Sequence, residues 1–174
     1  MSNPVTKNLR DGSIKIFDGS TPPERVDVAC DEGNFTYTEH PKEAKEISDR
    51  GGLSHLREGD EVPVDWSFGV KFREFLSQGS NPITPHEAMM RRGAAAAWVT
   101  TNDDGGDVAT IDLELTIATP TSGEVPQSVL LKKCYNIQEE FAEGDEYNTL
   151  AFSGKAFVAA PTITADVGTL TPTP

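Results

Sequence analysis

The sequence predicts a mainly β fold, a β-sandwich or partial barrel of long antiparallel strands with one α-helix packed outside. Three observations lead to this fold class. Several long segments alternate between apolar and polar side chains, one well-capped helical segment lies in mid-chain, and turn-forming residues separate the segments. With 174 residues, of which 36% are hydrophobic, the chain is long enough for one domain with its own core.

The N-terminal part predicts an arm followed by short strands. Residues 1–10 are polar and show no periodic pattern, which is typical of an arm. Turn-forming Asp, Gly and Ser residues bracket a short apolar strand at 14–17. Alternating apolar residues at 26–30, a polar turn and a second short run at 35–38 predict a hairpin.

Residues 39–60 leave two interpretations open. Residues 42–47 fit either a short helix that ends before Gly51 or a charged strand and loop. Because only Ala44 and Ile47 are available for burial, an isolated helix here would be marginal. We therefore expect an exposed excursion, and excursions of this length within a domain often bind something.

Four long segments follow the pattern of strands with one apolar face. In residues 61–73 every second side chain is apolar, and 107–118, 129–141 and 146–158 are comparable, with a tight turn between the last two. At about 3.3 Å per residue, the first would span roughly 40 Å, whereas a usual strand has about 5–6 residues. Such length, with one polar face, indicates the wall of a large assembly rather than a small closed core.

One helix is predicted to start at Thr84. Thr84 can cap the helix, Pro85 suits its first position, and Glu87 can complete a capping box. Gly93 is a natural end, although an extension through residues 94–97 stays open. The three aspartates of 102–107 lack EF-hand spacing, so this segment is expected to be a turn rather than a calcium site.

The sequence carries little that indicates chemistry, and we expect neither an enzyme nor a bound cofactor or metal. His40, His55 and His86 do not form a metal-ligand pair and are interpreted as surface or capping residues. Cys30 and Cys134 belong to no nucleophile or metal motif and are interpreted as reduced, semi-buried thiols. No complete P-loop and no Gly-x-Ser-x-Gly motif is present in the sequence.

Charge and hydropathy narrow the classes of partner. A formal net charge of −13 argues against binding nucleic acid by neutralising phosphates. It fits either simple solubility or a surface that lies near DNA without holding it. The chain has no apolar run long enough to span a membrane, and its first residues do not resemble a signal peptide, so synthesis in a cytoplasm is expected.

The order of elements resembles that of the major tail (tail tube) proteins of long-tailed, non-contractile bacteriophages. The resemblance covers most of residues 10–158. It depends on the single mid-chain helix and on four local patterns: Asp11-Gly12-Ser13-Ile14-Lys15-Ile16, Asp49-Arg50-Gly51-Gly52, Glu58-Gly59-Asp60-Glu61-Val62-Pro63-Val64 leading into Trp66-Ser67-Phe68, and Glu143-Gly144-Asp145-Glu146-Tyr147-Asn148-Thr149-Leu150.

The resemblance implies a structural virion protein made in the host bacterial cytoplasm. Proteins of this family form rings of six that stack into a tube, and each subunit adds a four-stranded sheet to a continuous inner barrel. The lumen first holds a tape-measure protein and later conducts DNA without specific binding, while the tube ends meet tail terminator and tail tip proteins. The domain organisation implied is an N-terminal arm (1–10), a tail-tube β domain (11–158) whose exposed inter-ring loop is 39–60, and a C-terminal extended arm (159–174).

Strand parity combined with the resemblance assigns the two faces of the long strands. The predicted core residues are Val62, Val64, Trp66, Phe68, Ile111, Leu113, Tyr135, Ile137, Leu150 and Phe152. The predicted lumen-facing residues are Asp65, Ser67, Thr110, Asp112, Glu114, Asn136, Gln138, Thr149 and Ser153. The predicted inter-ring contacts are Glu46, Asp49, Arg50, His55, Arg57 and Glu58. Lys71, Lys132 and Lys155 share the lumenal parity and are expected to pair with acids or to lie at ring boundaries.

Two other functions remain alternatives. One is a monomeric ligand-binding β-barrel module, which would need an apolar interior. The other is a related tail part of similar fold, such as a terminator or a hub subunit.

Overall fold

The computed structural model describes residues 12–28, 35–50, 52–117 and 127–164. It confirms a mainly β fold with antiparallel strands and one short α-helix. The strands are β1 (Gly12–Phe17), β2 (Arg25–Val28), β3 (Thr36–Thr38), β4 (Ala44–Asp49), β5 (Gly52–Glu58), β6 (Val64–Lys71), β7 (Ile111–Ile117), β8 (Gln127–Ala142), β9 (Thr149–Ala156) and β10 (Thr162–Thr164). The helical elements are α1 (Pro85–Met90) and the 3-10 turn η2 (Gly93–Ala95).

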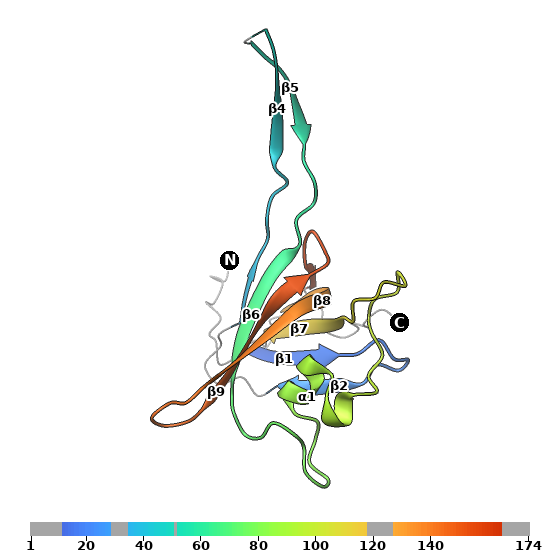
Figure 1. Ribbon diagram of the computed structural model, residues 1–174, viewed down its shortest axis with the longest axis vertical. Helices are drawn as coiled ribbons and strands as arrows, with labels where there is room; N and C mark the ends of the chain where they lie inside the picture. Colours follow the sequence, from blue (N-terminus) through green and yellow to red (C-terminus); the bar gives the residue numbers. More distant parts are fainter. Residues whose placement is uncertain (1–11, 29–34, 51, 118–126, 165–174) are drawn as a thin grey trace, which may run out of the picture.

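Eight strands form one antiparallel sheet, and β4 and β5 form a separate hairpin (Figure 1). The order in the sheet is β2-β1-β7-β8-β9-β6-β3, with β10 also paired to β8. β8 has 16 residues and joins the two halves of the sheet. Its N-terminal half pairs with β7 and its C-terminal half with β9.

The four predicted long strands are direct neighbours, in the order β7-β8-β9-β6. Only β8 reaches the predicted length, since β6 and β9 have 8 residues and β7 has 7. Pro63 lies just before β6 and cannot donate a ladder hydrogen bond. Ahead of β7, the Thr110 carbonyl accepts a hydrogen bond from the Thr101 N–H, and the Thr110 N–H donates one to the Thr100 hydroxyl. These bonds divert the chain at Thr110 from the sheet.

The core lies on one face of this sheet. Aromatic rings follow one another across β6 and β9, with centroids 5.9 Å apart for Trp66 and Phe68 and 5.4 Å apart for Phe68 and Phe152. The predicted core residues that are buried are Val64, Trp66, Phe68, Ile111, Leu113, Leu150 and Phe152. Val62, Tyr135 and Ile137 were assigned to the core as well, but they are only half-buried.

The predicted hairpin at 26–38 is wrong. β2 pairs with β1, whereas β3 pairs with β6 at the opposite edge of the sheet. The β1–β2 connection is stabilised by the buried side chain of Asp18. One of its oxygens accepts hydrogen bonds from the main-chain N–H groups of Ser20, at 3.2 Å, and of Glu24, at 2.7 Å. This local turn chemistry directs β2 back onto β1.

The helix begins as predicted. Thr84 accepts a hydrogen bond from the Glu87 N–H at 3.1 Å, and the Glu87 carboxylate accepts one from the Thr84 N–H at 3.0 Å. α1 contacts β1 and β2 on the core side of the sheet (Figure 1). It ends at Met90 because Arg91 takes a left-handed conformation with φ 50°, so residues 94–97 do not extend it.

Glu87 also stabilises the turn after the helix. It is 1% exposed and accepts a second main-chain hydrogen bond, from Ala94, at 3.0 Å. Burial acts to raise the pKa of its carboxyl group, but the hydrogen bonds from Thr84, Ala94 and Ser77 outweigh burial and lower the pKa to about 2.

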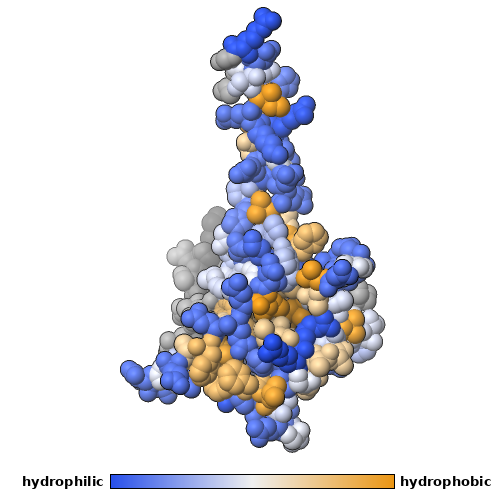
Figure 2. Space-filling model, in the orientation of Figure 1, coloured by the Kyte–Doolittle hydropathy of each residue, from blue (hydrophilic) through white to orange (hydrophobic). Residues whose placement is uncertain are grey.

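Residues 44–58 form a hairpin that projects far from the body of the molecule (Figure 1). The sequence left either a helix or a strand possible for residues 42–47. Residues 44–47 belong to strand β4 of this hairpin. Every residue of β4 is exposed, and the surface of the hairpin is mostly hydrophilic (Figure 2).

The two predicted arms are described only in part. Residues 1–10 and Cys30 lie outside the described residues, as do residues 165–174. Within the predicted C-terminal arm, β10 pairs with residues 128–130 of β8. In the part of the chain that the structure describes, no helix has the length and apolar character needed to cross a membrane.

Candidate functional site

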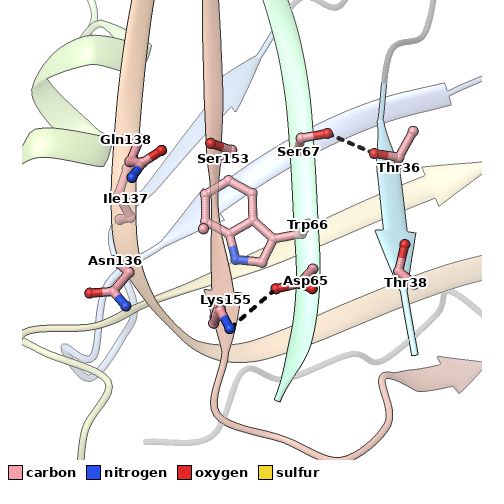
Figure 3. Close-up of a pocket in the computed structure, with 11 residues that line it drawn as sticks. Thr36, Thr38, Asp65, Trp66, Ser67, Asn136, Ile137, Gln138, Ser153 and Lys155 are labelled. Atoms are coloured by element: carbon pink, nitrogen blue, oxygen red, sulfur yellow. Dashed lines mark hydrogen bonds and ion pairs between the residues drawn. The ribbon is translucent and has the colours of Figure 1, made fainter. Parts of the chain in front are cut away.

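A polar trough lies on the open face of strands β3, β6, β9 and β8 (Figure 3). One hollow of about 710 Å³ occupies its end nearest Lys155, and a second of about 760 Å³ continues it along β6, β9 and β8. The first is lined by Thr36, Thr38, Asp65, Trp66, Ser67, Asn136, Ile137, Gln138, Ser153, Gly154 and Lys155. The two hollows share Ser67, Gln138 and Ser153, so they form one continuous surface.

Strand register places a row of small polar side chains across the trough. Thr36 on β3 pairs with Ser67 on β6, Ser67 with Ser153 on β9, and Ser153 with Gln138 on β8. The hydroxyl groups of Thr36 and Ser67 are 2.7 Å apart and hydrogen-bonded (Figure 3). Because paired residues in an antiparallel sheet point to the same side, the row offers neutral hydroxyl and amide groups to solvent.

A second row carries the charged side chains of the first hollow. Asp65 pairs in register with Thr38 and with Lys155. Its carboxylate lies 3.8 Å from the Lys155 ammonium and 2.7 Å from His40 Nε2. Lys155, which has the predicted lumenal parity, is thus paired with an acid as expected. Lys71 lies over the Tyr147 ring, with its ammonium 4.3 Å from the centroid.

A bulge in β8 shapes the floor of the trough. The β8–β9 register shifts between Tyr135 and Gln138, and Asn136 has a positive φ of 52°. Tyr135 pairs with Lys155 and so faces the trough side, which explains why the core assignment of Tyr135 is wrong. Gly154 is required opposite the bulge, because a Cβ there would lie 2.6 Å from the Tyr135 carbonyl oxygen and 2.7 Å from the Trp66 ring.

The structure brings together five of the predicted lumen-facing residues and separates the others. Asp65, Ser67, Asn136, Gln138 and Ser153 all line the trough. Thr149 is half-buried at the far end of β9, beside Lys71 and Ala142. That these residues face a lumen stays a prediction, since the subunit alone does not contain one.

The lumen-facing assignment is wrong for three residues, which are buried and lie on no open face. Thr110, Asp112 and Glu114 are 4%, 2% and 3% exposed. Thr110 bonds to the hydroxyl of Thr101 at 2.8 Å. Asp112 accepts a hydrogen bond from the Lys133 N–H at 2.9 Å, and burial raises the pKa of its carboxyl group. The Glu114 carboxylate is 3.9 Å from the Lys15 ammonium on the neighbouring strand.

Sequence reasoning missed two residues that line the trough, Thr36 and Thr38, and the neighbouring His40. The first two lie on β3, which the sequence assigned to a hairpin with β2 rather than to the edge of β6. His40 was interpreted as a surface histidine, and it contacts Asp65. Three residues of alternating Thr and Tyr carry no signal for which strand they pair with, so only the tertiary structure could place them.

The predicted inter-ring residues all lie on the projecting hairpin and are exposed. Glu46 and Asp49 belong to β4, Arg50 lies at the turn, and His55, Arg57 and Glu58 belong to β5. Two apolar side chains accompany these charged groups: Ile47 is 41% exposed and Leu56 is 70% exposed. Contact with an adjacent ring remains a prediction.

The other groups considered for chemistry have structural partners. Asp103 and Asp104 form ion pairs with Lys133, the latter at 2.8 Å, so this segment is a turn closed by a lysine. His86 Nδ1 lies 2.6 Å from the Glu139 carboxylate, which ties α1 to β8. Burial raises the pKa of the Cys134 thiol and makes it a poor nucleophile. Among the described side chains, no group of three or more metal-ligating residues converges.

Comparison with known proteins identifies one similar fold. No protein-family model matches the sequence, and no curated protein matches it. The structure is similar to a chain of the anti-feeding prophage baseplate, determined by cryo-electron microscopy and 6-fold symmetrised, with a TM-score of 0.55. The match covers 97% of this chain and 100% of that chain at 10% sequence identity, so it shows a shared fold.

Proposed function

We propose that this protein is a structural subunit of a phage-type tail, in which six copies form a ring and stacked rings form the tail tube. The observation that carries the proposal is the continuous polar trough on β3, β6, β9 and β8, whose opposite face is the apolar core. A sheet with one packed and one polar face suits the inner wall of a channel. The shared fold with a chain of a 6-fold symmetrised prophage baseplate supports a place in a tail assembly of the virion.

Free backbone edges support closure into a ring. Among the described residues, no strand pairs with the β7 side of β8 beyond Cys134, and none pairs with the β3 side of β6 beyond Ser67. An exposed edge of this kind is a template for another strand. In a ring, the β8 edge of one subunit would meet the β3–β6 edge of the next, and a closed barrel would have no edge left.

The chemistry of the trough fits the passage of DNA without retention. Most polar side chains of the first hollow are hydroxyls and amides, and its lysine, Lys155, lies beside Asp65. The second hollow adds the acidic residues Glu139 and Glu140. A wall without excess basic charge does not gain affinity from counterion release, so phosphates would not be held. In this proposal the protein has no catalytic role, its lumen first holds a tape-measure protein, and its tube ends contact terminator and tip proteins.

Electron microscopy of the purified full-length protein tests the proposal. We expect negatively stained samples at high protein concentration to contain hollow tubes, and end views to show rings with sixfold symmetry. A sample that stays monomeric in sedimentation experiments across the same concentrations contradicts ring formation.

A second candidate is a ring subunit of the baseplate hub or the tail terminator. The observation that favours it is the source of the similar fold, which is a baseplate rather than a tube. This candidate predicts single or paired rings that do not elongate, whereas the tube predicts long stacks. The monomeric ligand-binding module is less well supported, because its apolar interior is filled here by side chains such as Trp66, Phe68 and Phe152.

Adding positive charge to the trough should slow DNA passage. In the Gln138→Lys/Ser153→Lys double variant, two neighbouring trough residues become basic in every subunit. We expect tubes to assemble but DNA ejection to be delayed by at least about threefold at 50 mM salt, with the delay shrinking toward 200 mM salt, because counterion release weakens as salt rises. Ejection is measured by the fluorescence of a dye that binds the released DNA.

The matched control for this prediction is Gln138→Glu/Ser153→Asp, which adds the opposite charge at the same positions. It should eject DNA at the normal rate. Normal ejection by the lysine variant in assembled tails contradicts a lumenal trough.

A further inference from the structure

We propose that the β8–β9 end of the subunit is the receptor for the β4–β5 hairpin of a second copy in the adjacent ring. The receptor, called the foot here, consists of an apolar cluster of Phe72, Phe75, Leu76 and Phe141 and an acidic turn of Glu143, Asp145 and Glu146. This inference rests on the proposed stacking of rings, and it identifies the surface that the hairpin contacts.

The hairpin needs a partner that its own subunit does not supply. All six residues of β4 are exposed, and the hairpin extends well beyond the sheet (Figure 1). Ion pairs of Lys42 with Glu58 and Glu61, and of Lys45 with Asp60, tie down its base but not its tip. A two-stranded hairpin without a packed face is marginally stable in water, so contact with another molecule would stabilise it.

Apolar and basic groups are spread along the hairpin from its turn toward its base. Leu56 and Ile47 expose 70% and 41% of their surface. Arg50 lies at the turn with a positive φ of 49°, and Arg57 is exposed on β5 nearer the base, in register with Lys45. Within the part of the chain that the structure describes, no carboxylate lies within ion-pair distance of Arg50 or Arg57. The hairpin therefore presents Arg50 and Arg57 with Ile47 and Leu56 between them, beside the exposed acidic groups Glu46 and Asp49 of β4.

The foot offers the complementary apolar surface. The rings of Phe72 and Phe75 are 4.6 Å apart, and the Phe141 ring lies 5.1 Å from the former and 5.6 Å from the latter. Phe75, Leu76 and Phe141 are nonetheless 41%, 52% and 40% exposed. Figure 2 shows apolar surface beside the β8–β9 turn at the lower left of the molecule. Covering these exposed apolar side chains with the aliphatic side chains of the hairpin would remove apolar area from water.

The acidic turn supplies the complementary charge. Glu143, Asp145 and Glu146 are exposed on the turn between β8 and β9, directly after Phe141. Gly144 keeps this turn tight, because a Cβ at that position would lie 2.5 Å from the carbonyl oxygen of Tyr147. Three like charges on a short turn repel one another until a cation approaches. Arg50 and Arg57 of the incoming hairpin are such cations, and arginine matches carboxylates bidentately.

The two surfaces lie at opposite ends of the same strands. β6 starts at Val64, which pairs with Ala156, and the hairpin leaves the sheet at that end. β6 ends at Lys71, which pairs with Thr149, where the β8–β9 turn begins. A second copy displaced along the strand direction therefore brings its foot toward the hairpin (Figure 1). Such a head-to-tail contact does not close on itself, and it elongates a stack.

Charge reversal on either side of the contact tests this inference in the full-length protein. Arg50→Glu/Arg57→Glu alters the hairpin, and Glu143→Lys/Asp145→Lys alters the foot. We expect each double variant to form rings but to need at least about tenfold more protein to stack, since every subunit of a ring repeats the contact. The combination of all four substitutions in one chain should restore stacking, because the charges are again opposite. Sedimentation velocity and negative-stain images distinguish rings from stacks.

Arg25→Glu/Arg92→Glu is the matched control for the hairpin variant, because it makes the same change in net charge at exposed arginines outside both surfaces. It should stack like the unaltered protein. Stacking by either reversal variant at the normal concentration, or failure of the fourfold variant to regain it, overturns the receptor assignment while the tube proposal stands. Absence of rings in the unaltered protein is a different result, and it overturns the tube proposal itself.

Discussion

The Glu87→Gln variant is expected to lose about 3 kcal/mol of unfolding free energy at neutral pH. The Glu87 carboxylate is 1% exposed and accepts main-chain hydrogen bonds from Thr84 and Ala94. Its pKa falls from 4.5 to about 2, and each pKa unit corresponds to about 1.4 kcal/mol. The neutral amide keeps one acceptor oxygen but loses the charge that these hydrogen bonds stabilise.

The lowered pKa of Glu87 determines how its contribution to stability changes with pH. Because the pKa is lowered in the folded state, the stabilisation by Glu87 is complete above the unfolded pKa of about 4.5. It declines as the pH falls toward 2, so the stability difference between the two proteins should shrink over this range. Urea unfolding at several pH values measures it, with Glu140→Gln on the exposed side of β8 as the control. A difference that stays constant with pH contradicts the role of the charge.

The Asp112→Lys variant is expected to lose more than about 4 kcal/mol and to fail to form tubes. Asp112 is 2% exposed on β7, between β1 and β8. A lysine there would bury a cation beside the main-chain N–H of Lys133. That N–H now donates a hydrogen bond to the Asp112 carboxylate. Leaving a buried charge and a buried donor without partners is among the most destabilising changes known for single residues. Thermal unfolding of the purified variant measures the loss.

The Asp112→Asn variant is the control, and its expected result has the opposite sign to that of Glu87→Gln. Burial raises the pKa of Asp112, so the folded state favours the protonated form and gains relative stability as the pH falls. The asparagine oxygen can still accept the hydrogen bond from Lys133, and the cost of burying a charge disappears. Stability at neutral pH should therefore be unchanged or higher. A folded, normally stable lysine variant would show instead that residue 112 lies on an open face.

Local patterns predicted the elements that depend on neighbouring residues. The capping box at Thr84 and Glu87 forms because its partners are three residues apart, and local chemistry is sufficient to define it. Alternation predicted β6 well, since Val64, Trp66, Phe68 and Val70 are buried. The hairpin at 44–58 stayed ambiguous because both of its faces are exposed, so no hydrophobic period exists to separate strand from helix.

Other features depend on contacts between distant segments. Parity assigned Asp112 and Glu114 correctly to the side opposite Ile111 and Leu113, but parity does not reveal whether that side is also covered. The bulge between Tyr135 and Gln138 moved Tyr135 away from the core, and the only local sign is Gly154 on the partner strand. For β3, pairing with β6 rather than β2 could not be predicted from a strand of 3 residues.

A helical cryo-electron microscopy reconstruction of the assembled protein would show which face of the sheet lines the channel. We expect a hollow tube whose inner wall is formed by β3, β6, β9 and β8, with Ser67, Gln138 and Ser153 facing the lumen and α1 outside. A reconstruction in which this polar trough faces the exterior or is buried between subunits would contradict this expectation.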